Sequence, residues 1–433
     1  MDQLPIVPRP DPPPGARLLR RARSHVMDVA PLRRSRDFRL LFVGHSVSYF
    51  GDAIVAVVVP YQVFQITGSV FAVGMLGLVQ LVPVFVFPIV GGAAADAMER
   101  RRLVITTQAV LAATSLVMAV NAARPTPLLW PLYVFAFLSS GLYTFNRPAL
   151  DTWPPRLLEP ELLPSSNALE AGFGTFASMV GPLVAGVLLA TAGASTAFIF
   201  DACTFVVAIA MVARMQPSPP ASDADGVSWA AIKGGFRFLA GKRNVQSVFL
   251  ADLNAMTFGW PMALMPAVAL RLGGLDHQAQ VLGLLFAAPA AGSFLTTVFS
   301  GRAKNVRRQG RAILFANIVW GVAIALFGLV HTVWAALLLL AVASAGDMVS
   351  GIYRSSILQA AVQDRYRGRL GGIAMATWAT GPSLGEVESG IVASLTSVPV
   401  SIVSGGLITV AGVAAIRWYA PGFWHYDARH PVA

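Results

Sequence analysis

The chain has 433 residues, of which 55% are hydrophobic and 12% are charged, and its formal net charge is +11. Soluble proteins are usually about 25% charged, so a soluble fold of this length is excluded. Stretches of about 20 apolar residues recur along the chain, and each is long enough to cross about 30 Å of hydrocarbon as a helix. A membrane barrel would need strands of about ten residues with alternating polarity, and that pattern is absent. The fold class is therefore all-α and integral to the membrane.

The first 37 residues are rich in proline and arginine and contain no apolar core, so we do not expect a cleavable signal peptide. Twelve transmembrane helices are predicted after this tail. They are expected near residues 40–66, 70–95, 103–123, 127–146, 168–190, 195–214, 246–270, 279–301, 312–331, 332–353, 369–394 and 397–418.

These spans predict a division of the chain into two six-helix bundles. The expected parts are a basic, proline-rich cytoplasmic tail (1–37), an N-terminal bundle (38–215), a cytoplasmic linker (216–244), a C-terminal bundle (245–418) and a cytoplasmic tail (419–433). Within the linker, residues 229–243 place Ile232, Phe236 and Leu239 on one face. Such an amphipathic helix is predicted to lie along the membrane surface.

The basic residues follow these spans unevenly. Thirty of the 32 lysines and arginines fall on one side of the membrane, and Arg124 and Arg271 fall on the other. Basic residues accumulate on the cytoplasmic side of membrane proteins, so we expect a multi-pass protein of the cell membrane with both termini in the cytoplasm. Because the positive charge reports orientation, no nucleic-acid partner is expected.

A faint internal repeat relates the two bundles. Glycines and prolines recur at a constant spacing of 206 residues: Pro60, Gly68, Gly77 and Pro83 reappear as Pro266, Gly274, Gly283 and Pro289. Repeated halves with binding sites between them are typical of secondary transporters. The repeat therefore predicts two pseudo-symmetric six-helix halves.

The loop between spans two and three carries the motif GGAAADAMERRR. It resembles the signature of the major facilitator superfamily, Gly-x-x-x-Asp-Arg-x-Gly-Arg-Arg, and the matching residues are Gly92, Asp96, Arg100 and Arg101. In that family the glycine permits close helix packing, and the aspartate caps or pairs with the opposite half in one transport state. The resemblance therefore implies the major facilitator fold and a conformational-switch motif in this loop.

A second resemblance lies in span five. Gly181, Pro182, Ala185 and Gly186 are similar to the antiporter motif of superfamily exporters, with alanine standing where a glycine is usual. Further segments look like the enterobactin-exporter-like, or drug:proton antiporter, branch of the superfamily: residues 38–42, 51–53, 67–69, 155–157, 167–168 and 364–369. The resemblance extends from Phe38 to about Trp418 and implies outward transport.

Intramembrane carboxyl groups are costly and therefore point to function. Asp52 lies about 18 Å into span one, near mid-membrane, and shares a helix face with His45. Because desolvation disfavours the charged carboxylate, Asp52 is the leading candidate for the coupling proton. His45 and Glu386 are secondary candidates. Glu388 follows Glu386 by two residues, so at most one of them is expected to face the cavity.

The remaining intramembrane acids are expected to have structural roles. Asp201, Asp252 and Asp347 lie nearer the ends of their spans, and Arg354 lies two turns from Asp347 as a candidate partner. The lone cysteine, Cys203, is expected to be a small packed core residue.

Aromatic residues are available to line an apolar cavity suited to amphipathic cargo, namely Phe145, Trp153, Trp260, Trp320 and Trp378. The sequence contains no ATP-binding glycine loop, no paired Cys/His metal cluster and no hydrolase nucleophile elbow. We therefore expect no cofactor, no metal site and no catalytic residue.

The sequence thus favours a monomeric secondary transporter that uses protons to export small amphipathic molecules, such as siderophores, antibiotics or other secondary metabolites. The nearer alternative is an importer of the same fold. An integral membrane enzyme or a lipid-handling protein is the alternative from another class, but the six histidines are scattered rather than clustered with acids.

The charge split predicts the topology. Alkaline phosphatase fused after Ala123 or after Gly193 should be active, because both positions are expected outside the membrane, whereas fusions after Arg102 should be inactive. A cytoplasmic signal at Ala123 or Gly193 would contradict the twelve-span arrangement.

Overall fold

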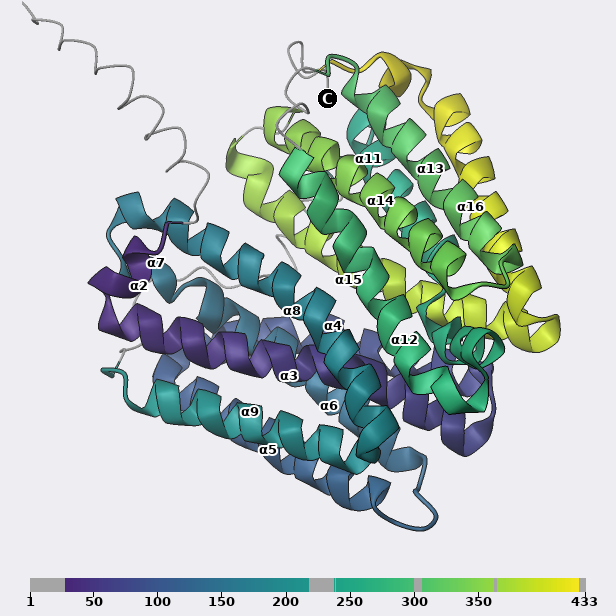
Figure 1. The fold of residues 1–433 in the computed structure, drawn as a ribbon. Coiled ribbons are helices and arrows are strands. Elements are labelled where there is room, and N and C mark those ends of the chain that lie inside the picture. Colours follow the sequence, from purple (N-terminus) through teal and green to yellow (C-terminus); the bar gives the residue numbers. More distant parts are fainter. Residues whose placement is uncertain (1–27, 218–236, 238, 300–305, 362–363, 428–433) are drawn as a thin grey trace, which may run out of the picture.

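The computed structural model describes residues 28–217, 237, 239–299, 306–361 and 364–427, and the described chain is helical throughout (Figure 1). Twelve of the helices in this part of the chain have sixteen residues or more: α3 (Arg36–Thr67), α4 (Val70–Ala97), α5 (Arg100–Ala122), α6 (Trp130–Asp151), α8 (Leu163–Thr191), α9 (Gly193–Ala213), α11 (Arg243–Phe258), α12 (Met265–Phe299), α13 (Gln309–Leu329), α14 (Val333–Ala361), α15 (Asp364–Leu395) and α16 (Val398–Tyr419). Shorter elements connect or flank them: α2 (Ala30–Arg34), α7 (Pro154–Leu157), η1 (Pro160–Leu162), η2 (Met262–Leu264) and η4 (Pro421–His425).

Nine stretches of the described chain are long and apolar enough to cross a membrane, and one of them, Arg243–Val298, contains both α11 and α12. Large apolar side chains cover the outer surface of the bundle, as helices in a bilayer require: Val120 is 69% exposed and Leu338 is 64% exposed. The twelve long helices are consistent with the twelve spans that the sequence predicts.

The seventh predicted span is not one continuous helix. The helix α11 ends at Phe258, and the chain passes through Trp260 and Pro261 before η2 and the first part of α12. Proline has no backbone N–H and interrupts the helical ladder, which explains the break at Pro261. The expectation of a single helix over 246–270 is therefore corrected.

Two glycines of the internal repeat both have positive φ, although their ψ angles differ. Gly68 ends α3 with φ 63°, and Gly274 interrupts α12 with φ 64°. Residues with a Cβ rarely adopt positive φ, so glycine suits both positions. Gly274 thus divides α12 into the end of span seven and the start of span eight, as Gly68 separates α3 from α4.

The helices pack in the same pattern in the two halves. We call α3–α9 the N-terminal half and α11–α16 the C-terminal half; the former is purple to teal and the latter green to yellow in Figure 1. The pairs α4 with α6, α5 with α9 and α3 with α8 have counterparts in α12 with α14, α13 with α16 and α11 with α15. This repeated pairing gives two pseudo-symmetric six-helix halves.

The halves pack tightly against each other at one end of the bundle. There α4 crosses α15 and α8 crosses α12, and small residues permit the close approach. A methyl group added at Gly74 would come within 3.1 Å of the Gly390 Cα, and one at Gly186 would come within 3.2 Å of the Gly283 Cα. The amide of Gln65 also donates a hydrogen bond of 2.7 Å to Gln278 across the halves.

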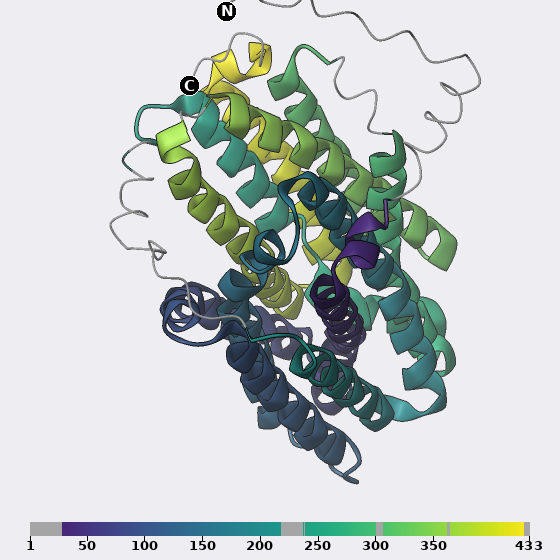
Figure 2. The same cartoon turned by 90° about the vertical axis from the view of Figure 1, so that its left-hand side faces the viewer.

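At the opposite end the two halves diverge. This end carries α2 and the beginning of α3 on one side, and the C-terminal η4 on the other (Figures 1 and 2). Phe423 of η4 is fully buried, and η4 packs against α13. Most of the predicted amphipathic helix lies outside the described residues, although Leu239 is buried in a cluster with Val245.

The sequence interpretation of Cys203 is wrong. Its side chain is exposed on α9, whereas its neighbours Ala202 and Thr204 are buried. The helix turns the cysteine away from α3 and α5, against which α9 packs.

The crossing of α8 and α12 yields a conformational prediction. Gly283→Ala should force α8 and α12 apart, because an added methyl would contact the Pro182 carbonyl at 2.5 Å. Overpacking of this kind costs about 1–3 kcal/mol, so the closed arrangement should become at least about fivefold less populated.

This shift can be measured by cross-linking cysteines introduced at Gln65 and Gln278 in a Cys203→Ser background. Gly174→Ala is the matched control on α8, because a methyl there would meet its nearest neighbour, Tyr49, at 4.0 Å. Equal cross-linking in the two glycine variants would contradict the role of the crossing.

Candidate transport site

A cavity of about 700 Å³ lies between the two halves. Small-molecule sites are typically about 300–1,000 Å³, so this volume suits a small organic molecule. The N-terminal half contributes α3, α4, α6 and α8 to its wall, and the C-terminal half contributes η2, α12, α13, α14 and α15. Most of the lining is apolar or aromatic, with hydroxyl groups from Ser139, Ser140, Ser178, Ser293 and Ser344.

Three carboxyl groups line this cavity: Asp52, Asp347 and Glu386. Asp52 lies midway along α3. Within the described residues, the side-chain carboxyl groups of Asp52 and Glu386 have no hydrogen-bond or ion-pair partner, although the Glu386 backbone carbonyl accepts from the Ser389 hydroxyl. Glu388 does not belong to the cavity wall. The geometry therefore places both carboxyl candidates for proton coupling at the same cavity.

Glu386 also lies at the crossing of α4 and α15. A methyl group added at Gly77 of α4 would come within 2.8 Å of the Glu386 Cβ and 3.0 Å of its Oε2. From α15, Glu386 thus contacts α4 at the crossing that closes one end of the bundle, and it also lines the cavity. One side chain connects the cavity to the contact between the halves.

Two of the five aromatic candidates reach the cavity. The indole rings of Trp260 and Trp320 stack with their centroids 6.0 Å apart and an angle of 5° between their planes. Trp153 is fully buried within the N-terminal half, Phe145 packs beside Leu103, and Trp378 is 55% exposed. Both tryptophans of the cavity therefore come from the C-terminal half, whereas the N-terminal half contributes the aromatic residues Tyr49, Phe135 and Tyr143.

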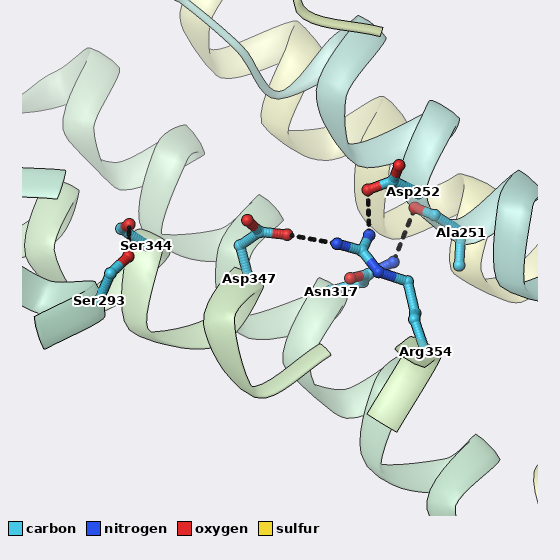
Figure 3. A network of polar contacts seen from close by, with 7 residues as sticks. All are labelled: Ala251, Asp252, Ser293, Asn317, Ser344, Asp347 and Arg354. Atoms are coloured by element: carbon cyan, nitrogen blue, oxygen red, sulfur yellow. Dashed lines mark hydrogen bonds and ion pairs between the residues drawn. The ribbon is translucent and has the colours of Figure 1, made fainter. Parts of the chain in front are cut away.

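An arginine organises the acids of the C-terminal half (Figure 3). Arg354 of α14 forms an ion pair with Asp252 of α11 and a second, 3.2 Å long, from Nη2 to Asp347 Oδ1. The Arg354 and Asp252 side chains are 9% and 4% exposed, and that of Asp347 is 31% exposed. Asp347 thus pairs with the arginine that its spacing indicates and also lines the cavity, which the sequence analysis did not anticipate.

Figure 3 also shows how neighbouring helices support this network. The amide of Asn317 donates to the carbonyl of Ala251 at 2.9 Å, which joins α13 to α11 beside Asp252. The hydroxyl groups of Ser293 and Ser344 lie 2.7 Å apart and join α12 to α14, three residues before Asp347. The polar groups therefore fix the relative positions of four helices around the cavity.

His45 lies away from the central cavity. It lines a small pocket with Arg147, Asp151 and Glu170, near the diverging end of the N-terminal half. Arg147 Nε and Asp151 Oδ1 form an ion pair of 3.0 Å, and these side chains are 39% and 51% exposed. His45 therefore belongs to a separate polar group from Asp52, although both are on α3.

Asp201 of α9 packs against α3. Its Oδ2 accepts a hydrogen bond of 2.6 Å from the Ser115 hydroxyl. Its Oδ1 lies against Gly51, since a methyl group added there would come within 2.6 Å of this oxygen. Asp201 thus packs next to the backbone of Asp52, which fits the structural role expected for it.

The described residues contain no group of three His, Cys, Asp or Glu side chains that is arranged to hold a metal ion.

Comparison with known proteins agrees with this architecture. A family model described as a transmembrane secretion effector matches residues 26–428. The chain belongs to the transmembrane secretion effector family.

Among the relatives of this family member is the enterobactin exporter EntS of Shigella boydii, with 25% identity over 391 residues, 90% of this chain and 93% of the relative. The enterobactin exporter EntS of Escherichia coli matches with the same identity and coverage. The resemblance to the major facilitator superfamily and its enterobactin-exporter-like branch is therefore confirmed.

Solved structures show the same fold. A bacterial homolog to the human lysosomal transporter Spinster, in an inward-facing and unoccupied conformation, gives a TM-score of 0.68 with 16% identity and coverage of 91% of this chain and 96% of that one. A bacterial homologue of the iron transporter ferroportin in an inward-facing state gives 0.66 with 17% identity, covering 90% and 99%. The family member is an efflux transporter with the major facilitator fold, and not an enzyme.

The arginines of the loop motif connect helix ends within the N-terminal half. Arg100 is 3% exposed and its Nε donates to the Thr152 hydroxyl at 3.3 Å. Arg101 donates to the carbonyl of Ala213 at the end of α9, where a positive charge complements the helix dipole. Gly92 and Asp96 lie in the last turns of α4, but their side chains lie outside the described residues, so their switching role stays a prediction.

The antiporter-like motif lies at the contact between the halves. Gly181, Pro182, Ala185 and Gly186 are largely buried in α8, and Gly181 packs against Ala53 of α3. Because Gly186 meets α12 at Gly283, the motif contributes to the closed end of the bundle.

Sequence reasoning missed two polar contacts. The hydrogen bond between Gln65 and Gln278 joins the halves, and Arg147 gathers the acids near His45. Gln65, within the predicted span 40–66, is itself a signal, since its polar group requires a partner in the membrane. Gln278 and Arg147 lie just outside the predicted spans and gave no such signal.

The Arg354 network predicts a stability effect. Arg354→Gln leaves Asp252 buried without its charge partner, which should cost about 3–5 kcal/mol. The purified protein should therefore unfold at a clearly lower temperature in a detergent melting assay. The double variant Asp252→Asn with Arg354→Gln should recover part of the loss.

Arg147→Gln is the control from the other half. Its ion pair with Asp151 is much more exposed, so the change should cost about 1 kcal/mol or less. If Arg354→Gln melts no lower than Arg147→Gln, the buried network does not stabilise the fold.

Proposed function

We propose that this chain is a monomeric, proton-coupled exporter of small amphipathic molecules in the cell membrane, with both termini in the cytoplasm. The observation that carries the proposal is the cavity between the halves, which contains an unpartnered carboxyl group, Asp52, midway along a membrane-spanning helix. Such a group has the position required to exchange a proton for cargo.

The orientation rests on the uneven distribution of basic residues. With the termini in the cytoplasm, the tight crossings of α4 with α15 and α8 with α12 face outward, and the diverging end faces the cytoplasm. In this orientation the structure corresponds to an inward-facing state. Alternating access then requires the two glycine-rich crossings to open while the diverging ends approach each other.

Proton coupling follows from competition within one cavity. A charged carboxylate in a low-dielectric cavity is stabilised either by a proton or by a compensating group on the cargo. Binding of one therefore weakens binding of the other, and this reciprocity is what coupled exchange requires. Asp52 is the proposed proton carrier, and Glu386 is the second candidate at the same cavity.

The other candidates take supporting roles in this proposal. His45, in its pocket with Arg147 and Asp151, lies on the proposed cytoplasmic side of Asp52 and offers a route for proton release. Gly92 and Asp96, at the cytoplasmic end of α4, govern conformational switching rather than cargo affinity.

The coupling proposal is tested with purified protein in proteoliposomes whose lumen is made acidic. Ethidium, anilinonaphthalene sulfonate and Nile red provide fluorescent amphipathic probes that are cationic, anionic and neutral. A proton-coupled exporter should concentrate at least one of them in the lumen. Asp52→Asn resembles the protonated form, so this variant should bind the probe but lose gradient-driven accumulation.

Asp276→Asn, which changes an exposed aspartate far from the cavity, should transport normally. Accumulation by Asp52→Asn equal to that of the wild type would assign the proton to another group, and Glu386→Gln would be tested next. Accumulation with the gradient reversed, with the outside acidic, would indicate an importer instead.

A further inference from the structure

The charged side chains that line the cavity have one sign. Asp52, Asp347 and Glu386 belong to its wall, and among the described lining residues there is no lysine, arginine or histidine. Arg354 approaches this wall from outside and is shared by Asp252 and Asp347, so that network holds two carboxyl groups and one guanidinium. An anionic cargo would therefore meet acidic groups without a basic partner on the described wall.

Two tryptophans line the same cavity as these carboxyl groups. Trp260 packs against α15 at Gly385, the residue before Glu386: a methyl there would come within 3.0 Å of the Trp260 Cβ. The backbone of Trp320 approaches α14 at Gly346, the residue before Asp347. A methyl group added at Gly346 would come within 3.5 Å of the Trp320 backbone nitrogen. Glu386 and Asp347, the residues that follow these two glycines, line the same cavity as the stacked indole pair.

The break in the seventh span creates this arrangement. The chain leaves α11 at Phe258 and places Trp260 and Met262 on the cavity wall. Gly259 leaves room for the second indole, because any side chain there would collide with the Trp320 ring. The Trp320 Nε1 is buried without a hydrogen-bond partner among the described residues, and Trp320 lines the cavity.

Indole rings and carboxylates favour the same kind of ligand. The face of tryptophan attracts cations more strongly than that of other aromatic side chains, and a carboxylate in a low-dielectric site gains stability from a positive partner. We propose that the stacked Trp260–Trp320 pair, which shares its cavity with Glu386 and Asp347, binds the aromatic or quaternary cationic group of the cargo. This inference rests on the proposed export function and names its substrate class: amphipathic cations.

The position of Asp52 agrees with a single positive charge on the cargo. Asp52 belongs to the N-terminal half and faces the same cavity from α3. A cation at Glu386 leaves Asp52 free to hold the exchanged proton. Cargo and proton then occupy different carboxyl groups of the same cavity, and each affects the other through its charge.

Tetraphenylphosphonium and tetraphenylborate provide a direct test, because they have nearly the same size and shape and opposite charge. Their binding is measured by titration calorimetry on the full-length protein in lipid nanodiscs, with empty nanodiscs as the blank. Tetraphenylphosphonium should bind at least about tenfold more tightly than tetraphenylborate. Equal binding, or tighter binding of the anion, would overturn the inference without any variant.

Variants locate the subsite. Glu386→Gln and Trp260→Ala should each weaken tetraphenylphosphonium binding by about fivefold or more. Glu388→Gln and Trp378→Phe are matched controls, because Glu388 is two residues further along α15 and Trp378 is exposed; both should bind as the wild type does. If Trp260→Ala does not fold, Trp260→Leu keeps an apolar side chain larger than alanine while removing the π system.

The result is separable from the export proposal. Gradient-driven accumulation of anilinonaphthalene sulfonate, together with absent tetraphenylphosphonium binding, would leave export standing and overturn the cation subsite. Tetraphenylphosphonium binding that depends on Glu386 and Trp260, without gradient-driven transport of any probe, would support the subsite and contradict proton-coupled export.

Discussion

The close approach of helices from the two halves is the constraint on which the rest of the structure depends. Apolar surface provides little driving force for helix association inside a bilayer, so contact relies on small residues that let backbones meet. Gly74 with Gly390 and Gly186 with Gly283 provide that contact at one end of the bundle. Because the halves meet there and diverge at the other end, a cavity forms between them, and its polar groups need not be paired within the protein.

The free-energy cost of burying a charge distinguishes the acids that are paired with Arg354 from the unpaired acids of the cavity. Arg354 neutralises Asp252, which is nearly inaccessible, and reaches Asp347 at the edge of the cavity. Asp52 and Glu386 have no such partner among the described residues, and their carboxyl groups face the cavity. Carboxyl groups in the membrane that are left unpaired are those that a proton or a cargo group can compensate.

Much of this arrangement was predictable from the sequence, because a small number of strict rules governs the length and polarity of membrane helices. The repeat predicted that Gly68 and Gly274 are equivalent, and both have positive φ. The contact of Arg354 with Asp252 was not predictable, since it joins helices 102 residues apart in the chain. Nor could the sequence decide which aromatic residues reach the cavity, because the rotation of each helix is set by its neighbours; the same ambiguity misplaced Cys203.

The repeat also reveals where the two halves differ. Gly181 and Pro182 correspond to Gly381 and Pro382 at a spacing of 200 residues. At the same spacing Gly186 corresponds to Glu386, so one crossing contains a glycine where the other contains a glutamate. A glycine at a crossing contributes only close packing, whereas Glu386 touches α4 and faces the cavity as well. In the proposed mechanism, a proton or cargo group bound at Glu386 would change the charge at the α4–α15 crossing. That crossing would then be the more direct route from occupancy to conformational change.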